Sequence, residues 1–254
     1  MSVTKAIILA AGVGSRLRPL TDDRPKCLLE VGGRTLIDHQ MATLRRYGVI
    51  DVVVVVGYCS DLIRRHLGGR ARLVDNERYE HTNSLYSLWL AREELTSGAL
   101  ILNSDVLALP LLFDRLLQSP APDAILVERR DAFEPEDMKV MLNGSYVLDF
   151  GKDLARERAH AHNVGVAKFS GKGATRLVGC LEHLVATGHE NDWVPVAFGE
   201  FASHWPLTAV TTDGLPWIEI DYLEDLTRAR LEIEPAILAL DRIVDAKLAQ
   251  HALD

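Results

Sequence analysis

Cysteine is scarce in this sequence. The chain of 254 residues has three cysteines, Cys27, Cys59 and Cys180, and they are far apart. An odd, widely spaced set argues against a disulfide framework and indicates a reducing compartment, so we expect a cytoplasmic protein. No CxxC pair or Cys/His spacing typical of a zinc site is present.

Long apolar runs are also missing, since none reaches the ~18 residues that a membrane helix needs. We therefore expect no membrane association. The apolar stretch 6–13 behind Lys5 has the length of a short signal peptide, but Gly14-Ser-Arg16 follows directly and would make a poor cleavage region. A buried strand that ends in a glycine loop explains these residues better.

An excess of positive charge is the third feature that the sequence lacks. It has 28 Lys and Arg against 36 Asp and Glu, which gives a net charge of −8. A chain of this charge is not expected to bind nucleic acid or an anionic membrane through its overall field. An anionic substrate would have to be bound by a local cluster of Lys and Arg.

The first part of the chain alternates short apolar runs with helical patterns. We expect strands at 6–9, 51–57, 72–75 and 99–102, and helices at 35–47, 59–66 and 83–94. Strands that alternate with helices predict an α/β fold with a mostly parallel, Rossmann-like sheet and right-handed crossovers.

In the second part, several strand patterns follow one another without a helical pattern between them, which predicts a mixed sheet. We expect strands at 124–128, 139–142, 146–150 and 217–220, with an Asn143-Gly144 hairpin turn, and a helix at 173–187. A final apolar stripe contains Ile233, Ile237, Leu240, Val244 and Leu248. We expect one domain over residues 1–254. The stripe could pack on that domain or on a second copy, so a homodimer stays open.

The strongest local feature is the segment 9–26, which reads LAAGVGSRLRPLTDDRPK. It is not a P-loop, because Leu17-Arg18-Pro19 stands where Gly-Lys-Ser/Thr is needed. It is not a dinucleotide fingerprint either, because the third glycine is missing and Pro19 would break the helix. A glycine loop followed by Arg16 and Lys26 suits a polyphosphate. An ordinary turn with solvent-facing charges is the alternative.

Residues 6–48 resemble the nucleotidyltransferases that activate sugar phosphates and choline phosphate with a nucleoside triphosphate. The shared signature is a strand, LAAGxGxRLxPxT, Pro25-Lys26 and the Gly-Gly turn of 31–34. The resemblance implies a GT-A-like fold, with a nucleotide-binding half at 1–110 and an acceptor- and metal-binding half at 111–254. It implies nucleotide contacts from Leu9, Ala10, Ala11, Gly12, Gly14, Ser15 and Arg16, and further ones from Asn83 and Ser84.

Carboxylates follow two of the expected strands. Asp105 comes after strand 99–102, at the strand end where open α/β sheets bind ligands. Glu219 and Asp221 are two residues apart, which puts them on the same face of a strand. Phosphate chemistry needs oxygen ligands for Mg²⁺. The resemblance implies that Asp105 and Asp221 bind this metal, although a lone aspartate is more often a cap or a surface residue.

The segments 83–91 and 213–221 indicate the branch of the family. They are similar to the bacterial cytidylyltransferases that act on phosphocholine and on phosphonates, and they lack the Gly-Thr-Ala and Gly-Tyr-Trp-x-Asp-x-Gly stretches of the sugar-phosphate enzymes. The resemblance implies transfer of CMP from CTP to a small phosphate or phosphonate acceptor, with release of pyrophosphate. The implied catalytic residues are Arg16, Lys26, Asp105 and Asp221.

The acceptor site is less defined by the sequence. Glu219 could pair with an amine, and Tyr86, Trp193, Trp217 and Tyr222 could supply rings. Where phosphocholine relatives often have Gly-Glu, this chain has His160-Ala-His162-Asn163. This difference weakens the case for a quaternary amine and leaves room for a more anionic or hydroxylated acceptor, although we still favour an acceptor that carries an amine. Two exposed histidines in a surface loop are the alternative explanation.

Two other functions remain open at this stage. One is a sugar-1-phosphate nucleotidyltransferase that uses UTP, dTTP or CTP. The other is a regulator that binds a nucleotide without catalysis, which would not need the combination of Arg16, Lys26, Asp105 and Asp221.

Overall fold

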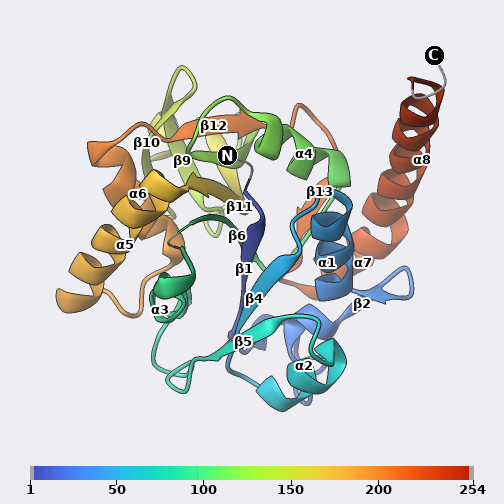
Figure 1. Ribbon diagram of the computed structural model, residues 1–254, viewed down its shortest axis with the longest axis horizontal. Helices are drawn as coiled ribbons and strands as arrows, with labels where there is room; N and C mark the ends of the chain where they lie inside the picture. Colours follow the sequence, from blue (N-terminus) through green and yellow to red (C-terminus); the bar gives the residue numbers. More distant parts are fainter. Residues whose placement is uncertain (1–2, 96, 252–254) are drawn as a thin grey trace.

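A nine-stranded mixed sheet forms the centre of the molecule. The computed structural model describes residues 3–95 and 97–251. The strand order is β5-β4-β1-β6-β11-β8-β12-β10-β9 (Figure 1). The strands are β1 (Lys5–Ala10), β4 (Asp51–Val56), β5 (Arg72–Asp75), β6 (Gly98–Asn103), β8 (Ala124–Arg129), β9 (Lys139–Asn143), β10 (Tyr146–Gly151), β11 (Ala161–Ser170) and β12 (Thr208–Thr211).

The direction of the strands changes along the sheet. β5, β4, β1 and β6 are parallel, whereas β11 runs antiparallel to both β6 and β8. β8 and β12 are parallel again, and β10 is antiparallel to β12 and β9. The predicted α/β class, with parallel strands first and mixed strands later, is confirmed.

Helices cover both faces of the sheet (Figure 1). Side chains alternate along β1, so that Ile7 and Leu9 pack toward α3 (Ser84–Leu90), α5 (Gly171–Ala186) and α6 (Val194–His204). Ala6, Ile8 and Ala10 face α1 (Leu36–Arg46), α2 (Ser60–Leu67) and α4 (Pro110–Gln118). Two apolar cores therefore fix the central strands, and with them the loops at their carboxyl ends.

Several elements differ from the expectation. The helix expected at 83–94 ends at Leu90 and continues as a 3₁₀ turn over Arg92–Leu95. The strand expected at 217–220 is β13 (Trp217–Glu219), which pairs with β7 (Val106–Ala108) outside the main sheet. Helices α4 and α6 and strands β7 and β12 were not expected at all.

The C-terminal segment packs partly on its own domain. It contains α7 (Leu223–Arg228), a π-helical turn (Ala229–Ile233) and α8 (Glu234–His251), which extends away from the sheet at its end (Figure 1). Ile237 is buried in a third apolar core, and Ile233 and Leu240 pack against it. Val244 and Leu248 lie outside the residues whose side chains are described. No helix in the described part is long and apolar enough to cross a membrane.

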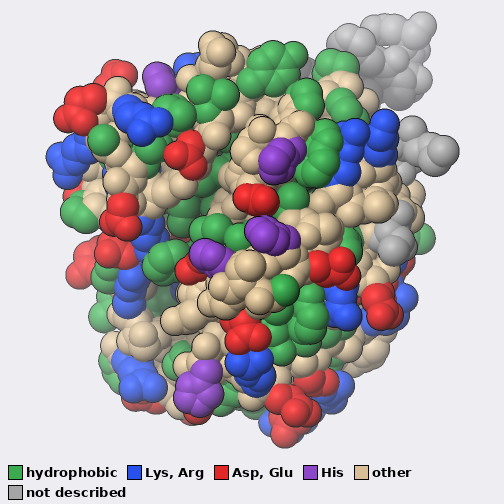
Figure 2. Space-filling view, turned by 90° about the vertical axis from the view of Figure 1, so that its left-hand side faces the viewer, with side chains coloured by type: hydrophobic (Ala, Val, Ile, Leu, Met, Phe, Trp, Pro, Cys, Tyr) green, Lys and Arg blue, Asp and Glu red, His purple; other side chains and the backbone are tan. Residues whose placement is uncertain are grey.

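Charged side chains of both signs are interspersed on the face that Figure 2 shows. Charged side chains of both signs also line a cavity at the edge of the sheet, where β1 and β6 end.

Candidate active site

A cavity of about 440 Å³ lies where β1 and β6 end. The two strands are parallel neighbours, with Leu9 opposite Asn103, so the segments that follow them reach the same edge of the sheet. All of the predicted nucleotide contacts line this cavity, namely Leu9, Ala10, Ala11, Gly12, Gly14, Ser15, Arg16, Asn83 and Ser84.

The glycine loop turns back onto Lys26. Gly14 has a φ of 65°, in the left-handed region, and begins a single 3₁₀ turn over Ser15–Leu17. A Cβ at Gly14 would lie 3.2 Å from Cβ of Lys26. A glycine at this position therefore serves both the backbone conformation and the close approach of the lysine.

Asp105 and Asp221 meet because β7 and β13 pair. The amide of Ile220 donates to the carbonyl of Asp105 at 3.1 Å. Both amides at positions 221 and 222 donate to the Asp225 carboxylate, at 3.0 and 2.9 Å, and this fixes the turn that carries Asp221. The two aspartates, far apart in the sequence, thus face one point in the cavity.

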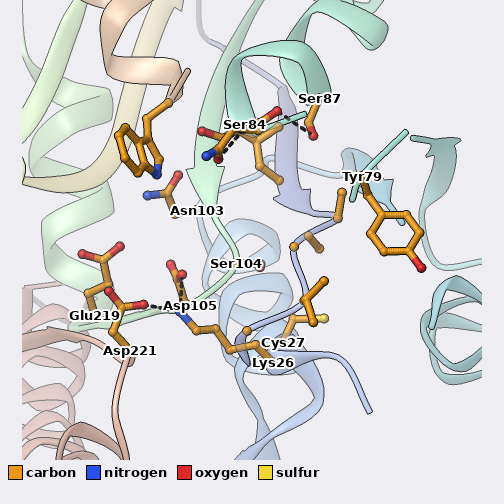
Figure 3. Close-up of a pocket in the computed structure, with 18 of the residues that line it drawn as sticks. Lys26, Cys27, Tyr79, Ser84, Ser87, Asn103, Ser104, Asp105, Glu219 and Asp221 are labelled. Atoms are coloured by element: carbon orange, nitrogen blue, oxygen red, sulfur yellow. Dashed lines mark hydrogen bonds and ion pairs between the residues drawn. The ribbon is translucent and has the colours of Figure 1, made fainter. Parts of the chain in front are cut away.

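That point is occupied by the ammonium of Lys26 (Figure 3). Its Nζ lies 2.8 Å from Oδ2 of Asp105 and 2.5 Å from Oδ1 of Asp221. Burial disfavours the ammonium, but the two carboxylates outweigh burial and raise the pKa of Lys26 above its usual value. Lys26 therefore stays cationic at neutral pH. The pKa of Asp221 is lowered, because Lys26 and Arg16 outweigh the opposing effect of its burial.

The cluster extends into a series of alternating charges, which we call the charge chain. Its members, in order of contact, are Lys152, Glu136, Arg16, Asp221, Lys26 and Asp105. The Glu136 carboxylate lies 3.0 Å from Nζ of Lys152 and 2.6 Å from the guanidinium of Arg16. Arg16 in turn lies 3.3 Å from Asp221. Within the described residues, Lys152 and Asp105 form the two ends of the charge chain.

The Asp105 end suits a divalent cation. Its Oδ1 is buried and has no hydrogen-bond partner in the described part of the chain. Asp105 and Asp221 already converge on one cation, the Lys26 ammonium, so both are within reach of a shared position. Magnesium is typically bound by one or two carboxylates together with substrate phosphates. These two aspartates fit that pattern, and no group of three or more potential ligands occurs in the parts described.

The side of the cavity next to α3 is polar. Asn83 caps this helix, with its Oδ1 accepting from the Ser84 amide at 2.8 Å, and Ser84 Oγ accepts from the Val194 amide at 2.8 Å. Tyr79 lies at the opposite side of the view from Glu219 (Figure 3). Further residues line the cavity that were not predicted from the sequence, namely Asn76, Tyr79, Thr82, Ser87, Asn103 and Ser104.

The other side of the cavity contains Glu219 and Trp193. The Glu219 carboxyl has its pKa raised to about 8, first by burial and then by the charges of Asp105 and Asp221. The missed residues on this side are Glu136, Met138, Lys152, Asn163 and Pro195.

Three of the four rings predicted at the acceptor, those of Tyr86, Trp217 and Tyr222, do not line the cavity. Tyr86 is buried, stacks on Trp89 with ring centroids 5.2 Å apart, and is covered by Arg78. Trp217 is buried and donates to Glu128 at 3.2 Å. Neither ring lines the cavity. Both pack in the interior, where large aromatic side chains are commonly found. The structure therefore does not bring these two predicted acceptor contacts to the cavity. Tyr222 is exposed and lies under Arg16, with its ring centroid 5.4 Å from the guanidinium carbon.

The two histidines of segment 160–163, where this chain differs from the phosphocholine enzymes, have different environments. His160 is exposed, but His162 lies on β11 and is buried, with its ring packed edge-on against Trp217 at 5.5 Å. Burial and the charge of Arg130 lower the pKa of His162 to about 4. The interpretation as two exposed histidines thus fails for His162. Its burial is not evident from the sequence, because the residues of β11 (Ala161–Ser170) are not among the expected strands.

This fold and site define an α/β enzyme that handles phosphate groups. Residues 6–240 match the model of the MobA-like NTP transferase domain, and the chain belongs to this family of nucleotidyltransferases. The resemblance drawn from residues 6–48 is thereby confirmed.

Similar proteins act on different acceptors. The chain is 28% identical over 246 residues to the CTP:phosphoglutamine cytidylyltransferase of Campylobacter jejuni, covering 87% of this chain and 97% of that protein. It is 37% identical over 130 residues to the CMP-5'-(3-aminopropyl)phosphonate synthase of Streptomyces rubellomurinus, covering 49% of this chain and 21% of that one. Among solved structures, the CTP:phosphocholine cytidylyltransferase of Streptococcus pneumoniae superposes with a TM-score of 0.76 at 27% identity, covering 91% of this chain and 98% of that one.

Proposed function

We propose that this protein transfers CMP from CTP to a small phosphate or phosphonate acceptor and releases pyrophosphate. The observation that carries the proposal is the position of Lys26, which is held between Asp105 and Asp221 and faces the glycine loop in one cavity. The choice of CTP and of a small acceptor is supported by the relatives described above, which are named as cytidylyltransferases and as a CMP-phosphonate synthase.

The reaction requires charge neutralisation more than proton transfer. An acceptor oxygen attacks the α-phosphorus of CTP, the bond from that phosphorus to the bridging oxygen breaks, and pyrophosphate leaves with the bonding electrons. A phosphate monoester has a second pKa of about 6, so the attacking oxygen is ionised at neutral pH without a general base. Positioning and electrostatic stabilisation then account for catalysis.

Each residue of the cavity contributes to phosphate binding or charge stabilisation according to its position. Lys26 places a fixed positive charge at the α-phosphate and the incoming oxygen, and Arg16 binds the triphosphate. Asp105 and Asp221 would hold Mg²⁺, which supplies further positive charge to the phosphate oxygens when bound. Backbone groups near Ala11 and Gly12 bind the base, with Asn83 and Ser84 shaping that end of the cavity.

Glu219 is proposed as the partner of an amine on the acceptor. It lines the same cavity as Asp221 and comes from the strand that precedes it. A cation bound beside the carboxylate would favour its ionised form and so oppose the raised pKa of Glu219.

The cavity favours a small acceptor over a sugar phosphate. Its volume of about 440 Å³ is toward the lower part of the range of ~300–1,000 Å³ seen for ligand sites, and it must hold a nucleotide as well. A non-catalytic regulator would not need a buried lysine between two carboxylates, since holding charged groups out of water is costly.

The three cysteines are free thiols, and we propose the cytoplasm as the location.

The proposal is tested by pyrophosphate release in a grid of substrates. CTP, UTP, dTTP, GTP and ATP are each combined with phosphocholine, 2-aminoethylphosphonate, 3-phosphonopropionate and glucose 1-phosphate. We expect CTP to exceed UTP at least tenfold in kcat/KM, with one of the three small acceptors. A clear preference for UTP or dTTP with the sugar phosphate would contradict the proposal. Lys172→Met removes an exposed lysine on α5 and serves as the control variant.

A further inference from the structure

We infer that Gln40 is a positioning residue, which holds the turn that carries Asp105 where this carboxylate can bind a divalent cation. This inference rests on the proposed function, because it concerns a residue that the proposal assigns to Mg²⁺. Gln40 lies on α1, and no residue of α1 lines the cavity in the part of the chain described. It therefore acts through the turn and not on the substrates.

Asp105 lies in a short turn that leaves the main sheet. β6 ends at Asn103, residues 104 and 105 form the turn, and β7 begins at Val106. β7 pairs with β13, whereas β6 stays in the nine-stranded sheet, so the two strands that flank the turn belong to different sheets. The turn is thus not fixed by the hydrogen-bond ladder of a hairpin, and its conformation depends on contacts from other elements.

The side-chain amide of Gln40 contacts both ends of this turn. Its Nε2 donates to the carbonyl of Asn103 at 2.7 Å and to the carbonyl of Val106 at 2.9 Å. A side-chain amide nitrogen has two N–H donors, and both are used here on the residues that flank the turn. One planar group therefore holds the two strand ends at a fixed separation.

Gln40 is almost completely buried in making these bonds. The residue is 3% exposed, and its Oε1 is buried without a hydrogen-bond partner among the described residues. A buried acceptor that is left unpaired is destabilising, and an apolar side chain of the same length would avoid this cost. The two donors are therefore the property of Gln40 that the turn requires.

Helix α1 is a firm support for this side chain. Thr35 caps the helix, and its hydroxyl accepts from the Asp38 amide at 3.2 Å. Ile37 and Leu44, three residues before and four residues after Gln40, are buried in the apolar core. Residues at these spacings share one face of a helix, so the face that carries Gln40 is anchored on both sides. Regular elements of this kind position side chains more precisely than loops do.

Two backbone hydrogen bonds support the turn from other directions. The Ser104 amide donates to the carbonyl of Leu9 at 3.2 Å, and the carbonyl of Asp105 accepts from the Ile220 amide at 3.1 Å. The bonds from Gln40 are the part of this support that comes from a side chain, so a substitution can remove them and leave the backbone bonds in place.

A divalent cation is sensitive to the position of the Asp105 carboxylate. Mg²⁺ requires oxygen ligands at about 2.0–2.1 Å in near-octahedral geometry. A displacement of about 1 Å at a reacting centre can cost ~100-fold in rate. Loss of the Gln40 donors should therefore weaken Mg²⁺ binding and lower kcat, while the glycine loop and Arg16 still bind the triphosphate.

The experiment separates the two donors from the shape of the side chain. Gln40→Met keeps the length and removes both donors, and Gln40→Glu keeps the shape and replaces the donating nitrogen by an oxygen. Ile37→Val shortens a buried side chain one turn away and controls for a general loss of packing. The measurements are Mg²⁺ binding by calorimetry, hydrogen exchange of the backbone amides at 104–106 by NMR in the metal-free protein, and kcat and KM for CTP.

We expect Gln40→Met to raise the Kd for Mg²⁺ by about fivefold or more, and to speed exchange at 104–106 and lower kcat by about tenfold or more each. KM for CTP at saturating Mg²⁺ should stay within about twofold, because the triphosphate contacts are kept. Gln40→Glu should be impaired at least as much, since an oxygen then faces two carbonyls. Ile37→Val should stay within about twofold of the native protein in every measurement.

Native Mg²⁺ affinity or native amide exchange in Gln40→Met would overturn the inference. Native behaviour of Gln40→Glu would do the same, because shape alone would then be sufficient, and so would an equal effect of Ile37→Val. If Gln40→Met does not fold, Gln40→Asn, whose amide is one methylene shorter, takes its place with the same expected results. If no acceptor is turned over, the proposed function fails, and Mg²⁺ binding and amide exchange still test the role of Gln40.

Discussion

Replacing Lys26 with methionine should reduce turnover far more than it reduces CTP binding. Methionine keeps most of the buried stem but removes the ammonium that lies 2.8 Å from Asp105 and 2.5 Å from Asp221. The charge is needed most when negative charge moves from the attacking oxygen to pyrophosphate, and Arg16 and the glycine loop remain to bind the triphosphate.

The size of the effect follows from the site. Removing one preorganised group that stabilises developing negative charge costs about 100- to 1,000-fold in kcat, or about 2.7–4 kcal/mol. We expect this loss in Lys26→Met, with KM for CTP changed less than about tenfold. Stability should fall as well, because Asp105 then loses its cation and Asp221 keeps, among the described residues, only Arg16, 3.3 Å away. Breaking a fully buried pair costs about 3–5 kcal/mol, but the Asp221 side chain is 32% exposed. We therefore expect about 2 kcal/mol, or a Tm lower by about 4–8 °C.

Two assays check this reasoning. Initial rates of pyrophosphate release at varied CTP separate kcat from KM, and thermal melts with and without Mg²⁺ follow stability. Mg²⁺ should raise the Tm of Lys26→Met more than that of the native protein, since a cation relieves the repulsion between Asp105 and Asp221. A kcat within about fivefold of the native value, or a loss seen only in KM for CTP, would refute the role given to Lys26.

The remaining predictions concern the carboxylates. Asp105→Asn and Asp221→Asn should each lower kcat by at least about 100-fold, and weaken Mg²⁺ binding measured by calorimetry, while circular dichroism stays native; normal Mg²⁺ affinity would remove the metal assignment. Glu219→Gln should raise KM for 2-aminoethylphosphonate about tenfold and leave KM for 3-phosphonopropionate within about twofold, and equal effects on both would mean that Glu219 does not pair with an amine. Burial raises the pKa of Asp38, but hydrogen bonds from Thr35, Arg70 and His66 outweigh it and lower this pKa in the folded protein. The ionised carboxylate therefore stabilises the fold at a pH above the pKa that Asp38 has in the unfolded chain, and this stabilisation is lost as the pH falls through the pKa in the folded protein. Asp38→Asn should thus lower the free energy of unfolding by about 1 kcal/mol at pH 7, and urea titrations should show this difference shrinking below about pH 4.

The nucleotide half of the site could be predicted because its residues are local in sequence. The segment 9–26 carries the glycines, Arg16 and Lys26 together, and parallel neighbours β1 and β6 must deliver their loops to one edge of the sheet. The alternation of strands and helices fixes that arrangement from hydrophobic pattern alone. The nearness of Lys26 to Asp105 follows from the same logic.

The acceptor half could not be predicted from the same signals. The meeting of Asp221 with Asp105 depends on β7 pairing with β13, two three-residue strands more than a hundred positions apart. Glu136 precedes β9, Lys152 follows β10 and Asn163 lies on β11, and only tertiary packing brings these segments together at the cavity. Tyr86 and Trp217 have the rings that an amine-binding site needs, but both side chains are buried. An aromatic side chain contributes most to stability in the interior, and ring type alone does not indicate whether it lies there or at a site.

Transfer of CMP to the acceptor is established by identifying the reaction product. The native enzyme is incubated with CTP, Mg²⁺ and the best acceptor, and the products are followed by ³¹P NMR and mass spectrometry, with Asp105→Asn in parallel. We expect a CMP–acceptor conjugate and pyrophosphate in equal amounts, and neither product above background in the variant. Release of inorganic phosphate without a conjugate, or a conjugate formed equally well by Asp105→Asn, would contradict it.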